Sequence, residues 1–169
     1  KYEQKKEFIK TNWKRKNNTG GGLSLSIENG QTLEKAGINF SVIYGQCTNN
    51  NEKQLFNTLL KQAQYPTIEE SANYIATGIS IVIHPNNPFI PSIHMNYRYF
   101  ELENKKNTYW WFGGGTDLSP ALLIKEDIRT FHNSYKACCD KLDAYYYPKF
   151  KTQCDQYFYL PHRKEHRGT

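Results

Sequence analysis

The stretch that decides the fold is residues 93–102, which read IHMNYRYFEL. Apolar and polar side chains alternate through most of it, and this alternation predicts a β-strand with two different faces. Because successive side chains of a strand point to opposite faces, we expect His94, Asn96 and Arg98 on the same face. A polar turn at residues 103–107 and a second strand-like run at 108–112 follow. The two runs are therefore predicted to pair as antiparallel strands.

Other alternating runs extend this pair into a meander. Residues 78–83 have strand character, and the prolines at 85, 88 and 91 predict an irregular connection to the next strand, because proline cannot donate to a sheet ladder. Further upstream, residues 23–27 alternate, Asn29-Gly30 suits a tight hairpin turn, and residues 38–44 are predicted to return as a paired strand after an interruption at 34–37. We expect an α+β fold with a broad antiparallel sheet.

Four segments have a helical pattern. Residues 1–16 mix lysines with Phe8, Ile9 and Trp13, which predicts a helix with a modest apolar stripe that ends at the glycine-rich run 17–22. Residues 51–64 carry apolar side chains at three- and four-residue steps and end before Pro66. Two more helices are predicted from about 125 to 142, with Glu126 in the favourable first turn, and from about 145 to 159.

Composition limits the class of protein. A chain of 169 residues that is 38% hydrophobic can build one core, and its net charge of +6 suits an anionic partner: a nucleic acid, a membrane surface or a polycarboxylate. No run of 18 apolar residues is present, so no transmembrane segment is expected. The four cysteines form no CxxC pair, and we interpret them as reduced thiols in a cytosol-like compartment.

The strand at 93–102 carries the side chains most suited to chemistry. Arg98 can clamp a carboxylate with two charge-assisted hydrogen bonds, Asn96 can donate and accept, and His94 changes charge near neutral pH. The alternative for this strand is a solvated polar sheet face. Ser80 and His84 share a face of the preceding strand and are candidates for the same cleft, the alternative being a buried serine and a loop histidine.

Weaker signals lie elsewhere in the chain. The glycines at 113–115 permit close approach of the backbone to a flat ligand, and Asp117 beyond them is a candidate carboxylate, although a plain turn explains both equally well. The spacing lacks the GxGxxG pattern of a dinucleotide site. A metal site is weakly suggested by four imidazoles, at His84, His94, His132 and His162, but neither HExxH nor a paired-cysteine motif supports it.

Six motifs carry a resemblance to a known family: GGG at 20–22, EKAG at 34–37, GIS at 78–80 with IHPNNP at 83–88, HMNYRYFE at 94–101, WWFGGGTDLSP at 110–120, and HR with RG at 162–168. In order and spacing they are similar to the oxygen-dependent coproporphyrinogen oxidases, from about Gly20 onward. The resemblance implies a broad antiparallel sheet flanked by helices on both faces, and a homodimer. It also implies an oxidoreductase of haem biosynthesis that converts two propionates of coproporphyrinogen III to vinyl groups, giving protoporphyrinogen IX and consuming dioxygen.

The resemblance also implies roles for particular residues. His94 matches the proposed proton donor and Asp117 a carboxylate that acts near the pyrrole nitrogens. Substrate contacts would fall on Ser80 and on the run Asn96, Tyr97 and Arg98, with Arg98 holding a propionate. No metal or organic cofactor is implied; some bacterial members use manganese, with ligands that would fall on His84, His94, His132 and His162, which we do not expect for this chain.

The family pattern continues beyond Arg167-Gly168, so we expect residues 1–169 to be the N-terminal half or more of the enzyme, a single partial domain that lacks activity alone. The family divides between the cytosol and the mitochondrial intermembrane space, and the cysteines favour a cytoplasmic location. An alternative function of another class is a basic module that binds single-stranded nucleic acid, with aromatic side chains stacking on bases and lysines holding phosphates. No nucleic-acid motif supports it, so we expect a small-molecule substrate and no nucleic acid.

Overall fold

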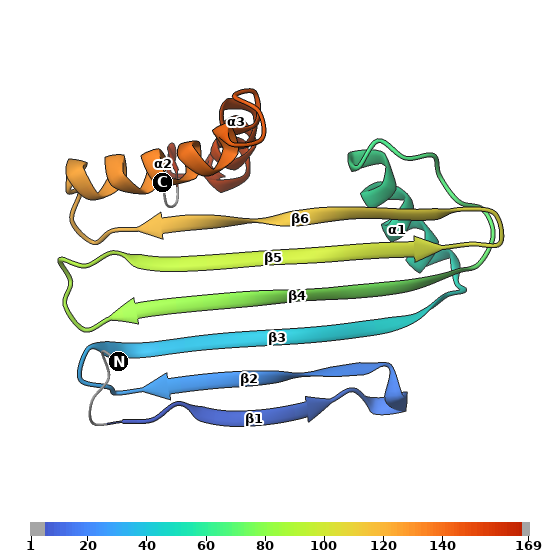
Figure 1. Ribbon diagram of the computed structural model, residues 1–169, viewed down its shortest axis with the longest axis horizontal. Coiled ribbons are helices and arrows are strands. Elements are labelled where there is room, and N and C mark those ends of the chain that lie inside the picture. The colour runs from blue at the N-terminus through green and yellow to red at the C-terminus, as the bar shows by residue number, and fades with distance from the viewer. Residues whose placement is uncertain (1–5, 167–169) are drawn as a thin grey trace.

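A six-stranded antiparallel sheet is the main element of the structure, a computed structural model that describes residues 6–166. The strands lie side by side in chain order from β1 to β6 (Figure 1). Their bounds are β1 (Ile9–Lys14), β2 (Gly20–Glu28), β3 (Leu33–Cys47), β4 (Ala72–Pro85), β5 (Ser92–Glu103) and β6 (Thr108–Ser119). The predicted α+β fold with a meandering antiparallel sheet is confirmed.

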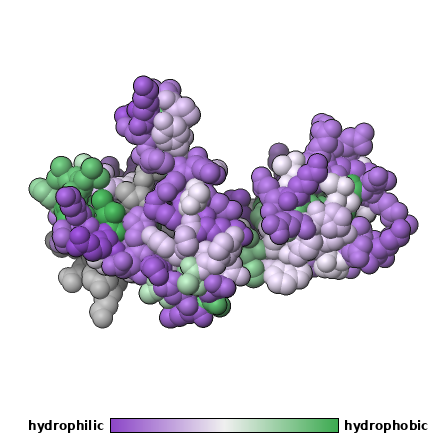
Figure 2. Space-filling view, turned by 90° about the horizontal axis from the view of Figure 1, so that it is seen from above, coloured by the Kyte–Doolittle hydropathy of each residue, from purple (hydrophilic) through white to green (hydrophobic). Residues whose placement is uncertain are grey.

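Three helices gather over the two ends of the sheet. They are α1 (Asn50–Gln62), between β3 and β4, and then α2 (Lys125–Asp140) and α3 (Tyr146–Phe158), which lie beyond β6 (Figure 1). A short 3-10 helix (Lys16–Asn18) joins β1 to β2, and β7 (Tyr159–Leu160) pairs with β8 (Glu165–His166) after α3. Figure 2 shows the α1 end and the α2–α3 end as two bulky masses with a narrower waist between them. None of the helices within residues 6–166 is long and apolar enough to cross a membrane.

α1 forms one core with the end of the sheet. The side chain of Asn49 caps the helix by accepting from the backbone N–H of Glu52 at 2.9 Å. Leu60 of α1 is fully buried with Leu102 of β5 and Cys47 of β3. Each such leucine contributes roughly 1.5–3 kcal/mol by leaving water. The predicted amphipathic helix at 51–64 is therefore confirmed, and its apolar stripe anchors the end of the sheet.

The register divides the side chains of the sheet between two faces. Residues directly opposite one another in paired strands point the same way, and neighbours along a strand point in opposite ways. We call one side the polar face, defined by the row Ser24, Asn39, Ser80, Asn96 and Gly115 on β2 to β6. The other is the apolar face, which carries Leu23, Leu25, Ile38, Phe40, Val42, Ile79, Ile81, Tyr97, Trp110 and Phe112.

Helices contact both of these faces. The α1 core lies on the polar face at one end, because Leu102 and Tyr109 are in register with the polar rows. At the other end, Tyr135 of α2 reaches the apolar face, where its hydroxyl lies close to those of Tyr97 and Thr116. Burial raises the pKa of Tyr135 above its ordinary value. The two contacts leave the middle of the polar face without a covering helix.

The predicted N-terminal helix is wrong. Residues Ile9–Lys14 form strand β1, while residues 1–5 of the prediction lie outside the described part of the chain. β1 pairs with β2 along its whole length, and this pairing provides hydrogen-bond partners for its backbone. The weak apolar stripe of a helix would stabilise this segment less than the pairing does. Lys10 and Lys14 place charge along this outer strand, a common feature of sheet edges.

Three glycine-containing segments are absorbed into strands: the end of the run 17–22, the interruption expected at 34–37, and 113–115, where a turn was one of two alternatives. Gly20–Gly22 begin β2 and Gly113–Gly115 lie inside β6, paired with Asn96 to Arg98 of β5, instead of forming turns. The segment 34–37 continues β3, with only a bulge between Leu33 and Lys35. Hydrogen bonds to neighbouring strands outweigh the low strand propensity of glycine at these positions.

Candidate functional site

Three cross-strand rows build the polar face. The first runs Ser26, Gly37, Val82, His94 and Asp117; the second runs Ser24, Asn39, Ser80, Asn96 and Gly115; the third runs Gly22, Ser41, Gly78, Arg98 and Gly113. His94, Asn96 and Arg98 therefore share one face, as their spacing predicts. The register adds Ser80 directly beside Asn96 and Asp117 directly beside His94.

Four side chains form a hydrogen-bonded chain that includes His94 and Asp117 of the first row. His84 Nε2 lies 2.9 Å from His94 Nε2, and His94 Nδ1 lies 2.8 Å from Asp117 Oδ2. Ser119 Oγ donates to the same carboxylate oxygen at 2.9 Å. The side chain of His94 is 35% exposed and that of Asp117 is 15% exposed. His94 is thus held at both ring nitrogens while one side of its ring stays open to solvent.

The contacts fix where protons can lie. A carboxylate only accepts, so His94 Nδ1 carries a hydrogen toward Asp117. Between the two Nε2 atoms there is room for one proton, so one imidazole donates and the other accepts. Burial lowers the pKa of His84, and electrostatic interaction with His94 and Lys35 lowers it further, against an opposing effect of Glu34. The arrangement suits His94 for giving and taking a proton, with Asp117 orienting its ring.

Other polar groups on this face have unused hydrogen-bonding capacity. The side chains of Ser80, Asn96 and Arg98 make no hydrogen bond or ion pair with another side chain among the described residues 6–166. Arg98 is exposed, and the residues directly opposite it on the neighbouring strands are both glycines: Gly78 on β4 and Gly113 on β6. A guanidinium left unpaired and exposed is available to a ligand carboxylate.

Glycines keep the surface around these groups flat. A β-carbon built on Gly37, Gly113 or Gly115 would meet nothing within 4 Å. The protein's own packing therefore tolerates a side chain at all three positions, and a side chain there would instead project into the space above the polar face. A flat molecule can approach the backbone at these points without displacing any protein atom.

Tyr97 is not brought to the polar face by its side chain. It points to the apolar face, where its hydroxyl lies 2.9 Å from that of Thr116. Only its backbone belongs to the row between Asn96 and Arg98. The expected substrate contact of Tyr97 is therefore restricted to main-chain atoms, because period two sends its ring away from its neighbours.

The four imidazoles suggested as metal ligands do not meet. His84 and His94 contact each other, whereas His132 of α2 lies 3.0 Å from the Tyr147 hydroxyl of α3. Within residues 6–166 no group of three or more His, Cys, Asp or Glu side chains could hold a metal ion. Manganese also prefers oxygen ligands in octahedral geometry. His84, His94 and His132 therefore do not form a manganese site in this part of the chain.

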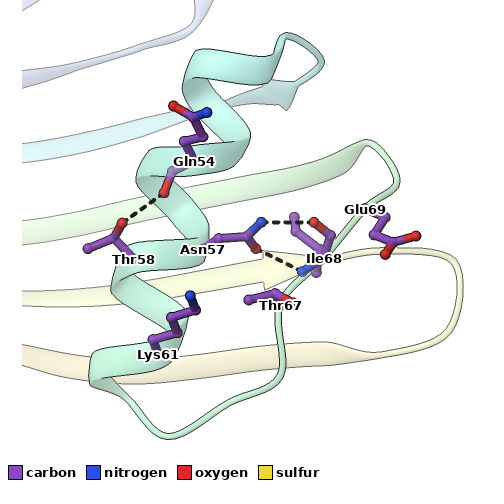
Figure 3. A pocket seen from close by; sticks show the side chains of 7 residues that line it. All are labelled: Gln54, Asn57, Thr58, Lys61, Thr67, Ile68 and Glu69. Atoms are coloured by element: carbon purple, nitrogen blue, oxygen red, sulfur yellow. Dashed lines mark hydrogen bonds between the residues drawn. The ribbon is translucent and has the colours of Figure 1, made fainter.

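One cavity lies away from these residues. It has a volume of about 550 Å³ and is formed by α1 and the loop that follows it. Figure 3 shows the Asn57 amide reaching from α1 to the loop, where it donates to the carbonyl of Ile68 at 3.0 Å and accepts from its N–H at 2.8 Å. The cavity is therefore the space between α1 and the loop that these two hydrogen bonds hold against the helix.

Sequence reasoning missed four residues of the polar face. Trp13 Nε1 donates to Asn39 Oδ1 at 3.2 Å, and Ser24 Oγ donates to the same oxygen at 2.8 Å; Ser119 supports Asp117. A signal was present, because small or polar residues recur at every second position in 22–26 and in 37–41. Only the strand register could show that they share a face with Ser80.

The fold and the site together define an α+β protein whose antiparallel sheet has a flat polar face with an exposed arginine and a histidine held at both ring nitrogens. Comparison with known proteins agrees. The profile of the family described as coproporphyrinogen III oxidase matches residues 1–169. The chain belongs to the coproporphyrinogen III oxidase family.

Individual relatives cover most of this chain. It is 44% identical over 154 residues to "Coproporphyrinogen-III oxidase 1, chloroplastic" of Arabidopsis thaliana, and 45% identical over 152 residues to "Oxygen-dependent coproporphyrinogen-III oxidase" of Drosophila melanogaster, in each case over 88% of the chain. It is 43% identical over 95% of the chain to "Oxygen-dependent coproporphyrinogen-III oxidase, mitochondrial" of Homo sapiens. The chain spans only 39%, 37% and 35% of the lengths of these relatives.

Proposed function

We propose that this chain is part of an oxygen-dependent coproporphyrinogen III oxidase and supplies the floor of its active site. The observation that carries the proposal is the polar face, where Arg98, Asn96 and His94 lie in line on a glycine-lined sheet. The substrate is a tetrapyrrole ring with four propionates, which needs an open surface wide enough for the ring, a cation for a carboxylate and a proton carrier. Family membership and the names of the relatives support the same activity.

The reaction removes a carboxylate and two electrons from each of two propionates. In each half-reaction the bond to the carboxylate carbon breaks to release carbon dioxide, the β-carbon loses a hydrogen, and a vinyl group remains. Dioxygen takes the two electrons and two protons to become hydrogen peroxide, so one proton is consumed from the site overall. Because the reduced substrate supplies the electrons, we propose that dioxygen is the co-substrate and that neither an organic cofactor nor manganese is required.

We assign roles to residues as part of this proposal. Arg98 holds the carboxylate of a propionate, and Ser80 and Asn96 add hydrogen bonds in the adjacent row. His94 moves a proton, with its ring held by Asp117 at 2.8 Å and by His84 at 2.9 Å. Arg98 and His94 are four residues apart, about 13 Å along the strand. That separation allows one group to bind a carboxylate while the other serves a different part of the same ring.

Turnover of coproporphyrinogen III by the full-length protein is the experiment that tests the function. We expect protoporphyrinogen IX, detected as porphyrin fluorescence after oxidation, in the presence and in the absence of a chelator. Loss of turnover with chelator, restored by manganese, would contradict the metal-independent part alone. A full-length protein that forms no product would contradict the proposed function. The nucleic-acid alternative has no support from the relatives, and would be shown by binding to single strands that weakens steeply with salt.

We also propose that the protein is a homodimer. Support comes from the apolar face, where Phe112 is 74% exposed, Trp110 52% and Phe40 47%. Contiguous exposed apolar surface of this kind is a mark of protein contacts. Sedimentation of the full-length protein should give twice the monomer mass, and a monomer at all concentrations would contradict the proposal.

The compartment stays a prediction. The four cysteines are free, as expected, which suits the cytoplasm. The mouse and human relatives are named as mitochondrial and several plant relatives as chloroplastic, which favours the organelle alternative. Fractionation of cells that express the tagged full-length protein distinguishes the two.

We also propose that residues 1–169 belong to a single domain. Limited proteolysis of the full-length protein would test this proposal.

A further inference from the structure

We propose that Asn39 of β3 forms a second carboxylate-binding point on the polar face, held in position by Trp13 and Ser24 and separate from the one at Arg98. The inference rests on the proposed function, because it takes the ligand to be a tetrapyrrole ring with several carboxylates. It concerns the half of the sheet made by β1 to β3, to which neither the motifs nor the relatives' names assign a role.

The orientation of the Asn39 amide is fixed by its neighbours. The indole N–H of Trp13 can only donate, so the atom 3.2 Å from it must be the amide oxygen. Ser24 Oγ donates to the same oxygen at 2.8 Å. With the oxygen held by two donors on the β1 and β2 side, the amide nitrogen faces away from both. Ordinary ambiguity between the two ends of an asparagine side chain is thus removed.

The amide nitrogen has no acceptor within the described residues 6–166. Asn39 is half-buried and lies directly beside Ser80, whose hydroxyl likewise binds no other side chain of this part of the protein. Two donors therefore orient the Asn39 amide, and both N–H groups of that amide remain without an acceptor in this part of the protein. A carboxylate is a strong acceptor for such a free N–H group, because a hydrogen bond to an ionised partner is roughly twice as strong as one between neutral groups.

Trp13 is itself held in place by a glycine. A β-carbon on Gly22 would lie 2.6 Å from Cζ2 of the indole and 2.1 Å from the carbonyl oxygen of Phe40. The ring therefore lies flat against the backbone of β2, where no other residue type fits. The indole fills the end of the polar face without rising above it, so a ring-shaped ligand can extend from Arg98 toward Asn39.

The separation of the two points suits two carboxylates of one molecule. Asn39 and Arg98 lie two strands apart and one row apart, which places their backbones about 12 Å from each other. A tetrapyrrole with propionates around its rim spans this distance with two of its carboxylates, and its ring then lies over Ser80, Asn96 and the glycines between them.

Binding of coproporphyrin III to the full-length protein tests the inference, since this oxidised ring keeps all four carboxylates and does not react. Asn39→Asp keeps the oxygen that Trp13 and Ser24 bind and replaces the two donors with a repelling charge. We expect the Kd to rise roughly 10- to 100-fold. Asn12→Asp is the matched control, because it adds the same charge to β1 on the apolar face; we expect a change below about twofold.

Two further variants keep the test decisive if Asn39→Asp folds poorly. Asn39→Ala should raise the Kd about 5- to 10-fold by removing the donors alone. Trp13→Phe keeps the ring over Gly22 and removes its N–H, so it should raise the Kd about 2- to 5-fold. In the Asn39→Ala background the same change should have no added effect, which a merely structural role of Trp13 does not predict.

The outcomes separate this inference from the proposed function. If Arg98→Ala weakens binding and the Asn39 variants do not, or if Asn12→Asp weakens it as much as Asn39→Asp, the inference is overturned and the proposed function stands. If the unchanged full-length protein turns over coproporphyrinogen III but does not bind coproporphyrin III, the inference alone is overturned; if it does neither, both are overturned.

Discussion

The polar and the apolar face of the sheet are made by the same strands and differ in almost every side chain. On the polar face the rows are built from serine, asparagine, glycine and single charged residues. The apolar face carries branched aliphatic and aromatic residues, and its row Ile27, Ala36 and Leu118 is almost fully buried at one end. Figure 2 shows hydrophobic colour gathered at the end of the molecule where the β4–β5 and β6–α2 connections lie.

The difference separates stability from ligand binding within one sheet. Strict alternation lets each strand contribute to a core with one set of side chains and to an open surface with the other. Residues of the polar face can then be selected for flatness and unused hydrogen bonds without weakening the core. We therefore expect changes in the three open rows of the polar face, away from the α1 core, to reduce activity with little loss of stability, and changes on the apolar face to do the reverse.

The largest effect is expected at Arg98. Arg98→Ala in the full-length enzyme removes the two charge-assisted hydrogen bonds that we assign to a substrate carboxylate. This change should lower kcat/KM about 1000-fold. Steady-state turnover measures it. Arg129→Ala, which removes an exposed arginine of α2 that lies 3.6 Å from Glu126, is the control. Near-normal turnover of Arg98→Ala would remove this residue from the site.

Asp117 is expected to act through His94. Asp117→Asn keeps the size of the side chain but no longer offers a carboxylate to His94 Nδ1 at 2.8 Å. The imidazole loses the partner that fixes its tautomer, so kcat should fall about 100-fold while KM changes little. Asp140→Asn, in the exposed ion pair of α2 with Lys136, should leave kcat unchanged. Equal effects of the two changes on kcat would show that Asp117 has no specific role.

Gly115 tests the flatness of the polar face. A β-carbon there meets nothing within 4 Å, so Gly115→Val should fold, with an unfolding midpoint equal to or above that of the parent because valine favours strands. The added side chain occupies ligand space and should lower kcat/KM about 10-fold. Thr77→Val, on the apolar face of β4, should leave turnover unaffected. If the Gly115 variant keeps full turnover, the ligand does not lie over that row.

The smallest effect is expected from pH. The pKa values of His84 and His132 are lowered, mainly by burial, so the folded protein favours their neutral forms. Their contribution to stability is full above the ordinary pKa of 6.5 and is lost as the pH falls through the lowered values. The free energy of unfolding, measured with urea, should therefore decrease on acidification.

Replacing both of these histidines by glutamine should flatten that dependence. His162→Gln, at an exposed position after β7, is the control and should leave the slope unchanged. A double variant as acid-sensitive as the parent would show that other groups set the acid stability.

The sequence predicted what depends on local pattern. Period two in 93–102 placed His94 and Arg98 on one face, and apolar spacing found α1, α2 and α3 within a few residues. The sequence could not predict the contact between His84 and His94, because the register of β4 against β5 depends on the conformation of the connection at residues 86–91. The N-terminal strand and the glycines of β6 were missed for the same reason: their conformation is decided by the neighbouring strand, not by their own propensity.

The central claim is that the ligand lies on the polar face, and the tryptophans of this chain report on it directly. Trp13 and Trp111 are in register with the polar face, and Trp110 with the apolar face. We would label the full-length protein with 5-fluorotryptophan, assign each resonance by a Trp→Phe change, and add coproporphyrin III. The account predicts ring-current shifts of the Trp13 and Trp111 fluorine resonances with that of Trp110 unmoved. A shift confined to Trp110 would contradict it.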